Sequence, residues 1–287
     1  SRHFVKKIHS EDDIAKLKNP VITHDELKSK TIREIYEDIF MDILEVQSRG
    51  APGFWFAPWD DIVEWTGVEQ ALMDLALRPN YMHALISRLS DIAVDVLNQY
   101  QKMDLLSSNN NNTRIGSGAY GYTTDLPKTD NTRFNGSDLW RSAAAQPFSE
   151  ASPEMHKEFA IEYEKKWLAN FGLNYYGCCE PLHNKIGILS DIPNLRKVSI
   201  SPFVNLEEAA EAVGDKYVFS WKPSPAVFAY NSWDIKTIRD YLINSIRVLN
   251  KYNCSIEIVL KDISTVQYRP KRLWEWAQVI MEVTNNF

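Results

Sequence analysis

The chain has 287 residues, of which 44% are apolar and 24% charged, and its formal net charge is −6. This composition is typical of a globular protein, and we expect a single domain over residues 1–287. The negative charge, with Lys and Arg scattered among acidic residues, argues against a nucleic-acid partner. No apolar run reaches the roughly 18 residues that span a bilayer, and the start of the sequence lacks the apolar core of a signal peptide. We therefore expect a cytoplasmic protein without a membrane segment.

The first part of the chain predicts helices with two short strands between them. Apolar residues recur at helical spacing. Helices are therefore expected over 11–17, 25–41, 62–77 and 79–103, and strands over 43–47 and 104–108. An aromatic stretch follows the first of these strands and either lines a substrate pocket or fills the core; it contains Phe54, Trp55, Phe56 and Trp59.

Residues 109–147 are rich in Gly, Asn, Ser and Thr and predict a long irregular excursion. Such loops in compact domains are usually functional or mobile. Asn109, the first residue of this stretch, is a candidate substrate-binding residue. Gly116–Gly121 matches the spelling of a dinucleotide-binding loop, but no helix follows it, so we interpret it as a flexible loop.

The second half alternates strands and helices, which predicts a parallel sheet with helical crossovers. Strands are expected at 173–178, 198–201, 217–221 and 256–262. The longer helices are expected over 152–167, over 234–249 and from Pro270 onward. This makes six strand–helix units, whereas a closed α/β barrel has eight. Either two N-terminal strands are missing, or the sheet is open.

Chemistry in parallel α/β folds is found at the carboxyl ends of the strands. The strand at 173–178 leads into Cys178, Cys179 and Glu180, with His183 shortly after. Thiolate, imidazole and carboxylate groups together suit zinc. The alternative is that the cysteines are small buried apolar residues.

Other strands end in polar groups as well. Ser201 and Lys222 end two of them, and Lys261 with Asp262 ends the last. A charged pair on an apolar strand is costly unless it is paired or functional. These residues therefore either belong to the site or form a salt bridge that closes a barrel. Cys254, at the opposite end of the last strand, is expected to pack in the interior.

Several short motifs together resemble the uroporphyrinogen decarboxylase superfamily. They are Phe56-Ala57-Pro58-Trp59 after a strand, Arg78-Pro79-Asn80 before a long helix, Ser152-Pro153-Glu154 at a helix start, and the cysteine-bearing strand. The resemblance implies an α/β fold of the (β/α)8 TIM-type barrel class, here lacking its first two strands. Within the superfamily, the chain is more similar to the zinc-dependent, corrinoid-linked methyltransferases than to the decarboxylases.

This resemblance implies Cys178 as a zinc ligand, because methyltransferases of this branch carry a His-x-Cys pair on the corresponding strand. Here Tyr176 stands in place of the histidine, and the distal cysteine of the branch falls near Lys261 or Asp262. Substitute ligands are then Cys179, Glu180, His183 or Asp262. The resemblance places the decarboxylase arginines and aspartate on the first two strands, which we expect to be absent from this chain, so these residues are not assigned.

Three functions follow as hypotheses. The first is a zinc-dependent methyltransferase that moves a methyl group between a small methylated compound and a corrinoid on a partner protein, with zinc as a Lewis acid. Its candidate residues are Cys178, Cys179 and His183 for the metal, Lys222, Asp262 and Glu180 for catalysis, and Trp55, Phe56, Trp59, Asn109, Ser201 and Lys261 for the substrate. The second is a metal-independent decarboxylase or lyase whose lysines bind carboxylates, and the third is a ligand-binding protein without turnover.

Overall fold

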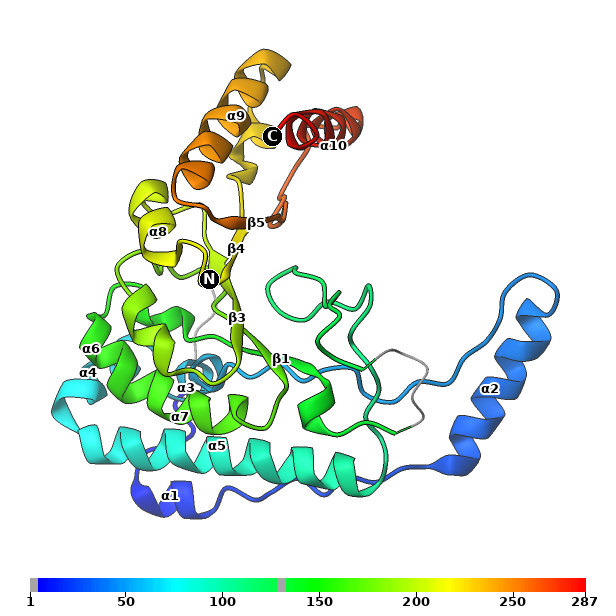
Figure 1. The fold of residues 1–287 in the computed structure, drawn as a ribbon. Helices are drawn as coiled ribbons and strands as arrows, with labels where there is room; N and C mark the ends of the chain where they lie inside the picture. Colours follow the sequence, from blue (N-terminus) through cyan, green and yellow to red (C-terminus); the bar gives the residue numbers. More distant parts are fainter. Residues whose placement is uncertain (1–4, 128–132) are drawn as a thin grey trace.

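A parallel sheet of five strands forms the centre of the computed structural model, which describes residues 5–127 and 133–287 (Figure 1). The strands lie in chain order in the sheet. They are β1 (Trp140–Ala143), β2 (Leu173–Tyr176), β3 (Leu195–Ile200), β4 (Val218–Trp221) and β5 (Ser255–Ile258). Each adjacent pair is parallel, so all carboxyl ends meet at one edge. The β–α alternation in the sequence correctly predicts this arrangement.

The helices before the sheet follow the expected pattern with one break. They are α1 (Glu11–Ala15), α2 (Glu26–Phe40), α3 (Pro58–Thr66), α4 (Val68–Leu77) and α5 (Pro79–Lys102). The single helix predicted over 62–77 is divided at Gly67, whose φ of 85° lies outside the helical region. Prolines 58 and 79 occupy the first helical positions, where a missing N–H costs nothing.

The helices after β1 serve mostly as crossovers. The α-helices are α6 (Pro153–His156), α7 (Glu162–Leu168), α8 (Leu206–Val213), α9 (Ile235–Lys251) and α10 (Lys271–Thr284), and a π-helical turn, η3 (Lys157–Ile161), joins α6 to α7. One short 3-10 helix, η1 (Gly136–Asp138), lies just before β1. Others follow β1, and they are η2 (Gln146–Phe148), η4 (Ile186–Asp191) and η5 (Pro225–Ala229). Among the described residues, no helix is both long and apolar enough to cross a bilayer.

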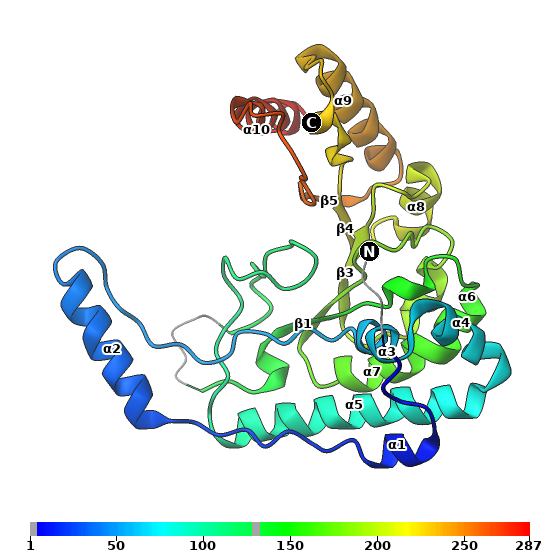
Figure 2. The same cartoon turned by 180° about the vertical axis from the view of Figure 1, so that it is seen from behind.

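Two large apolar clusters hold most of the described elements together, beside a third, minor one around Trp140 and Tyr175. The larger one packs α8, α9 and α10 against the strands, and it includes Val198, Phe219, Leu242 and Trp276. The smaller one packs α3, α4 and α5 around Trp59 and Phe148. By contrast, α2 buries none of its residues and extends away from the rest of the chain (Figures 1 and 2).

Several expected strands differ from the observed ones. Residues 43–47 form no strand, because they lie in an exposed connection; instead Ala51 and Phe56 form isolated parallel bridges with Leu106 and Ala143. The strand expected at 104–108 is reduced to that one bridge at Leu106. Strand β1, within the stretch expected to be irregular, was missed.

The sheet has two edges in the part of the chain that the structure describes. Strand β1 pairs with β2 and with the bridge at Phe56, and β5 pairs with β4. The α/β class with a parallel sheet is as expected and is consistent with a TIM-type fold. Closure into an eight-stranded barrel is not seen in residues 5–127 and 133–287.

Candidate functional site

The two adjacent cysteines lie just beyond the carboxyl end of β2. Gly177 ends the strand with a φ of 94°, a conformation that favours glycine, and its N–H donates to the Ala143 carbonyl at 2.9 Å. Glu180 then folds back, and its carboxylate accepts the Cys178 N–H at 2.9 Å. The Ser199 hydroxyl donates to the Cys178 carbonyl at 2.6 Å. The turn that presents the thiols is therefore fixed from both neighbouring strands.

Five residues form what we call the sulfur–lysine cluster: Cys178, Cys179, Lys261, Asp262 and Ser117. The two sulfur atoms lie 3.6 Å apart. Lys261 Nζ is 3.3 Å from Cys179 Sγ, 3.7 Å from Cys178 Sγ and 2.8 Å from Ser117 Oγ. Asp262 contacts the same ammonium at 3.1 Å. The cluster thus joins the ends of β2 and β5 to the loop that contains Ser117.

The two thiols differ in acidity. The hydrogen bond from Cys178, followed by the contact with Lys261, lowers the pKa of Cys179 below its usual range. The pKa of Cys178 is raised, first because it donates to Cys179 and second because it is buried. Since a thiolate is the nucleophilic form of cysteine, Cys179 is the more reactive of the two.

Lys222 lies beside this cluster, directly after β4, in a surrounding of neutral oxygens. Its Nζ donates to Ser199 Oγ at 2.7 Å, to Tyr175 Oη at 2.9 Å and to the Ser220 carbonyl at 3.3 Å. The side chain is 1% exposed. Burial, and then the positive charge of Lys261, lower the pKa of Lys222 to about 8.

A cavity of about 300 Å³ at the carboxyl edge of the sheet is lined by both lysines and both thiols. A second cavity of about 360 Å³ shares Cys178, Lys261 and Asp262 with it and adds Trp55, Arg114 and Ser117. A third, of about 210 Å³, shares Trp55 and Arg114 with the second. The three cavities therefore adjoin along the same edge.

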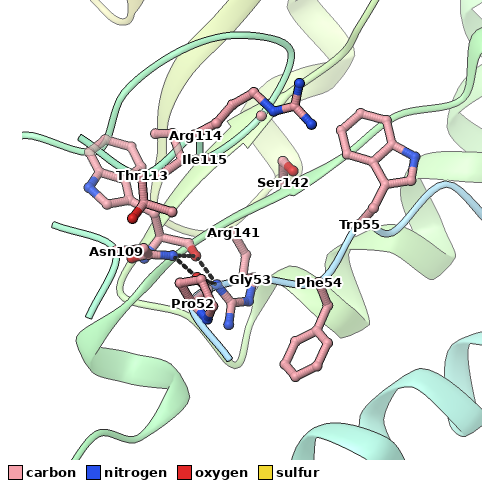
Figure 3. Close-up of a pocket in the computed structure, with 12 residues that line it drawn as sticks. Pro52, Gly53, Phe54, Trp55, Asn109, Thr113, Arg114, Ile115, Arg141 and Ser142 are labelled. Atoms are coloured by element: carbon pink, nitrogen blue, oxygen red, sulfur yellow. Dashed lines mark hydrogen bonds between the residues drawn. The ribbon is translucent and has the colours of Figure 1, made fainter. Parts of the chain in front are cut away.

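Figure 3 shows the third cavity, between the segment at residues 52–55 and strand β1. Trp55 and Arg114 lie on one side of it, and Asn109 and Arg141 on the other. The Asn109 side chain forms hydrogen bonds with the backbone, because its amide donates to the carbonyls of Pro52 and Trp140, each at 2.8 Å. It thus fixes the cavity wall, whereas substrate contact by Asn109 stays a prediction.

The structure brings seven of the expected site residues to these cavities: Trp55, Asn109, Cys178, Cys179, Lys222, Lys261 and Asp262. Others lie elsewhere. Phe56 packs against Trp167 in the core, and the Trp59 ring is fully buried against Phe148, so both take the core-filling alternative. Ser201 is buried and accepts the Phe203 N–H at 3.2 Å.

Glu180 and His183 also lie away from the cavities. Glu180 is fully buried beneath the cysteine turn, and burial raises the pKa of its carboxyl group. His183 points toward Glu208 on α8, at 3.9 Å. Neither side chain lines the cavities that hold the thiols, and catalysis by Glu180 and metal binding by His183 stay predictions.

The expectation of zinc can be compared with this geometry. Two thiolates on one tetrahedral zinc, with bonds of about 2.3 Å, lie about 3.8 Å apart, and the observed sulfur separation of 3.6 Å is similar. A third donor is missing, because no three His, Cys, Asp or Glu side chains gather suitably in the described ranges. Lys261 already places a positive charge beside both sulfurs. The side chains as they lie do not complete a zinc site, and zinc binding stays a prediction.

Sequence reasoning missed Ser117, Arg114, Tyr175 and Ser199. The glycines around Ser117 were the available signal: a Cβ at Gly116 would lie 2.4 Å from the Tyr175 ring, and Gly118 has a φ of 94°. This loop passes so close to β2 that only glycine fits. Its role is thus to bring Ser117 and Arg114 to the edge of the sheet.

No protein-family model matches the chain, and no curated protein matches it. A solved structure of a methyltransferase from Methanosarcina mazei is similar, with a TM-score of 0.50 and 9% sequence identity. The match covers 90% of this chain and 63% of the methyltransferase, so this chain spans less than two thirds of that protein's length. At this identity the likeness concerns the fold, and membership of the expected superfamily stays a prediction.

Proposed function

We propose that this chain is a methyltransferase that binds a small anionic substrate at the sulfur–lysine cluster. The observation that carries the proposal is the cavity at the carboxyl edge of the sheet, where Lys261 and Lys222 lie beside two thiols. The fold likeness to a methyltransferase supports the same reading. Methyl transfer needs an electron-rich sulfur, oxygen or nitrogen as acceptor, and a nearby cation stabilises such a group as an anion.

In this proposal the residues of the cluster have separate roles in substrate binding. Lys261 holds the anionic heteroatom of the substrate, as it already contacts the Cys179 sulfur at 3.3 Å. Asp262 and Ser117 orient the Lys261 ammonium through contacts of 3.1 and 2.8 Å. Trp55, which lines the adjoining cavity, covers the substrate from solvent.

The finer parts of the proposal concern the cofactors. We propose a corrinoid on a partner protein as the methyl carrier, which supplies a cobalt–carbon bond. Zinc at Cys178 and Cys179 would need a further ligand from the substrate or from a rearranged side chain. No step above depends on zinc.

Methylcobalamin and a panel of small thiols, phenols and carboxylates provide the test. We expect spectroscopically measured demethylation of methylcobalamin that falls about 100-fold in Lys261→Met, because an electrostatic contact to the reacting anion is lost. Lys216→Met is the matched control, since Lys216 is exposed before β4 at the opposite end of the sheet. Equal rates in both variants, or no turnover with any acceptor of the panel, would contradict the proposal.

A second candidate is a metal-independent decarboxylase or lyase. The observation that favours it is that two lysines line one cavity, which suits a substrate with more than one carboxylate. Release of carbon dioxide from a dicarboxylate in the presence of a strong chelator, without methyl transfer, would select this function over the first.

A further inference from the structure

Three lysines are almost completely buried in the described residues, and their partners differ. Lys197 pairs with Glu257 at 2.9 Å. Lys185 donates to the backbone carbonyls of Phe148 and Ser149 at 2.6 and 3.2 Å. Lys222 donates to two hydroxyls and one carbonyl, and no carboxylate within the described ranges lies within 4.0 Å of it. Of the three, Lys222 alone lines the cavity of about 300 Å³.

The partners of Lys222 suit an amine that loses its proton. A carboxylate partner favours the charged ammonium, whereas the Tyr175 hydroxyl can accept from an ammonium or donate to a neutral amine. Ser199 Oγ donates its proton to the Cys178 carbonyl, so it accepts a hydrogen bond from either form of Lys222. Tyr175 Oη and Ser199 Oγ lie 2.9 and 2.7 Å from Nζ. Burial, and then Lys261, also lower the pKa of Lys222 to about 8, so the neutral form is reached near physiological pH.

The backbone holds the base of this side chain in place. The Lys222 N–H donates to the Ile200 carbonyl at 2.9 Å, which extends the pairing of β4 with β3 by one residue. The side chain is therefore fixed at the carboxyl edge of the sheet, where it shares a cavity with Lys261, Cys178 and Cys179. A carbonyl compound bound in that cavity would share it with an amine and a second cation.

We propose that Lys222 is an amine nucleophile that forms an imine with a small 2-oxo acid bound in this cavity. The Nζ lone pair attacks the ketone carbon, and the carbonyl oxygen gains a proton to give a carbinolamine. The carbinolamine hydroxyl then leaves with a further proton as one water molecule, and the nitrogen loses its hydrogens to give the imine. The Tyr175 hydroxyl is within reach to exchange these protons.

The 2-oxo acid is chosen because of Lys261. Its ammonium lines the same cavity, and its contact with Asp262 is at the exposed end of the site, where the Asp262 side chain is 63% exposed. A carboxylate adjacent to the reacting carbonyl would therefore find a second cation, Lys261, in the lining of the same cavity. This inference goes beyond methyl transfer and does not depend on it.

Reductive trapping tests the proposal on the whole chain. The protein is incubated with pyruvate and sodium cyanoborohydride, and the adduct is located by peptide mass spectrometry. Because a pKa of about 8 makes the neutral amine roughly 300-fold more abundant than in an ordinary lysine at neutral pH, Lys222 should react at least about tenfold faster than exposed Lys216. Labelling of Lys216 at the same rate, or no adduct at Lys222, would overturn the proposal.

Two variants and a second probe sharpen the test. Lys222→Arg keeps the positive charge but forms no imine, so the adduct should disappear; Tyr175→Phe should slow labelling of an intact Lys222. Methyl pyruvate keeps the activated ketone but lacks the carboxylate charge, and it should label Lys222 at least about tenfold more slowly than pyruvate, which is the effect of losing one charged contact. Equal labelling by both compounds would refute the 2-oxo acid. If Lys222→Arg fails to fold, the position of the pyruvate adduct in the natural chain still shows whether Lys222 forms the imine.

Discussion

The two ends of the sheet carry the same residue types in different surroundings. At the amino ends, Lys216 precedes β4 as an exposed side chain, and Cys254 precedes β5 in a packed interior, where its thiol donates to the Ala210 carbonyl at 3.5 Å. At the carboxyl ends, Lys222 and Cys179 line a cavity. The comparison teaches that position relative to strand direction, rather than residue type, decides which lysine and which cysteine have access to a ligand.

The largest expected effect concerns the two lysines that flank β4. Burial lowers the pKa of Lys222 to about 8 from the ordinary value near 10.5. Between these values the unfolded chain holds a proton that the folded chain has lost, so the contribution of Lys222 to stability rises with pH across this window. Below about pH 8 both states are protonated and this contribution is constant.

Urea unfolding at several pH values measures this effect as the difference between the natural chain and Lys222→Met. The natural chain should gain up to about 3 kcal/mol relative to the variant between about pH 8 and 10.5. Nearby Lys261, Tyr175 and Cys178 titrate in both proteins, so most of their contribution cancels in the difference. Lys216→Met should show no such trend, and a flat difference for Lys222→Met would mean that Lys222 titrates normally.

The next effect separates the cysteines at the two ends. Cys179 has a lowered pKa and is partly exposed, whereas Cys254 is buried and its pKa is raised by that burial. Iodoacetamide at neutral pH should therefore alkylate Cys179 about 100-fold faster than Cys254. Peptide mass spectrometry over time gives both rates. Lys261→Met should slow the reaction at Cys179 alone; equal rates at the two cysteines would remove the distinction between the two ends.

The smallest expected effect concerns the metal. Ser117 Oγ lies 3.3 Å from Cys178 Sγ, so Ser117→Cys, which exchanges that oxygen for sulfur at the same position of the side chain, would place a third sulfur beside the two thiols. We expect zinc affinity, measured by competition with a chromophoric chelator, to rise about tenfold or more over the natural chain. Lys216→Cys is the matched control at the other end. No gain in Ser117→Cys would show that the geometry of the turn, rather than a missing donor, limits zinc binding.

Much of the fold was predictable because it depends on short-range patterns. Strands β2, β3 and β4 alternate with amphipathic helices, and a helical crossover between strands enforces parallel pairing. Strand β1 was missed because Trp140–Ala143 is only four residues long and follows a polar, glycine-rich stretch. Its apolar surroundings come from α7 and β2, which are distant in sequence.

Helices α2 and α9 show the same limit for amphipathic patterns. Both were predicted from apolar residues at helical spacing, yet α9 buries Leu242 and Ile246 whereas α2 leaves Leu27 77% exposed. Periodicity identifies a helix and its apolar face. The surface against which that face packs depends on the rest of the chain.

The sequence by itself determined the α/β class and the chemical groups at the strand ends, because strand direction alone brings Cys178, Lys222 and Lys261 to one edge. Only the tertiary structure decided how these groups act on one another. It placed the Lys261 ammonium beside two sulfur atoms, surrounded Lys222 with hydroxyls, and moved His183 and Glu180 away from the cavities. The physical reason is that pKa values and ligand geometry depend on distances of a few ångströms between side chains remote in sequence, which no local pattern encodes.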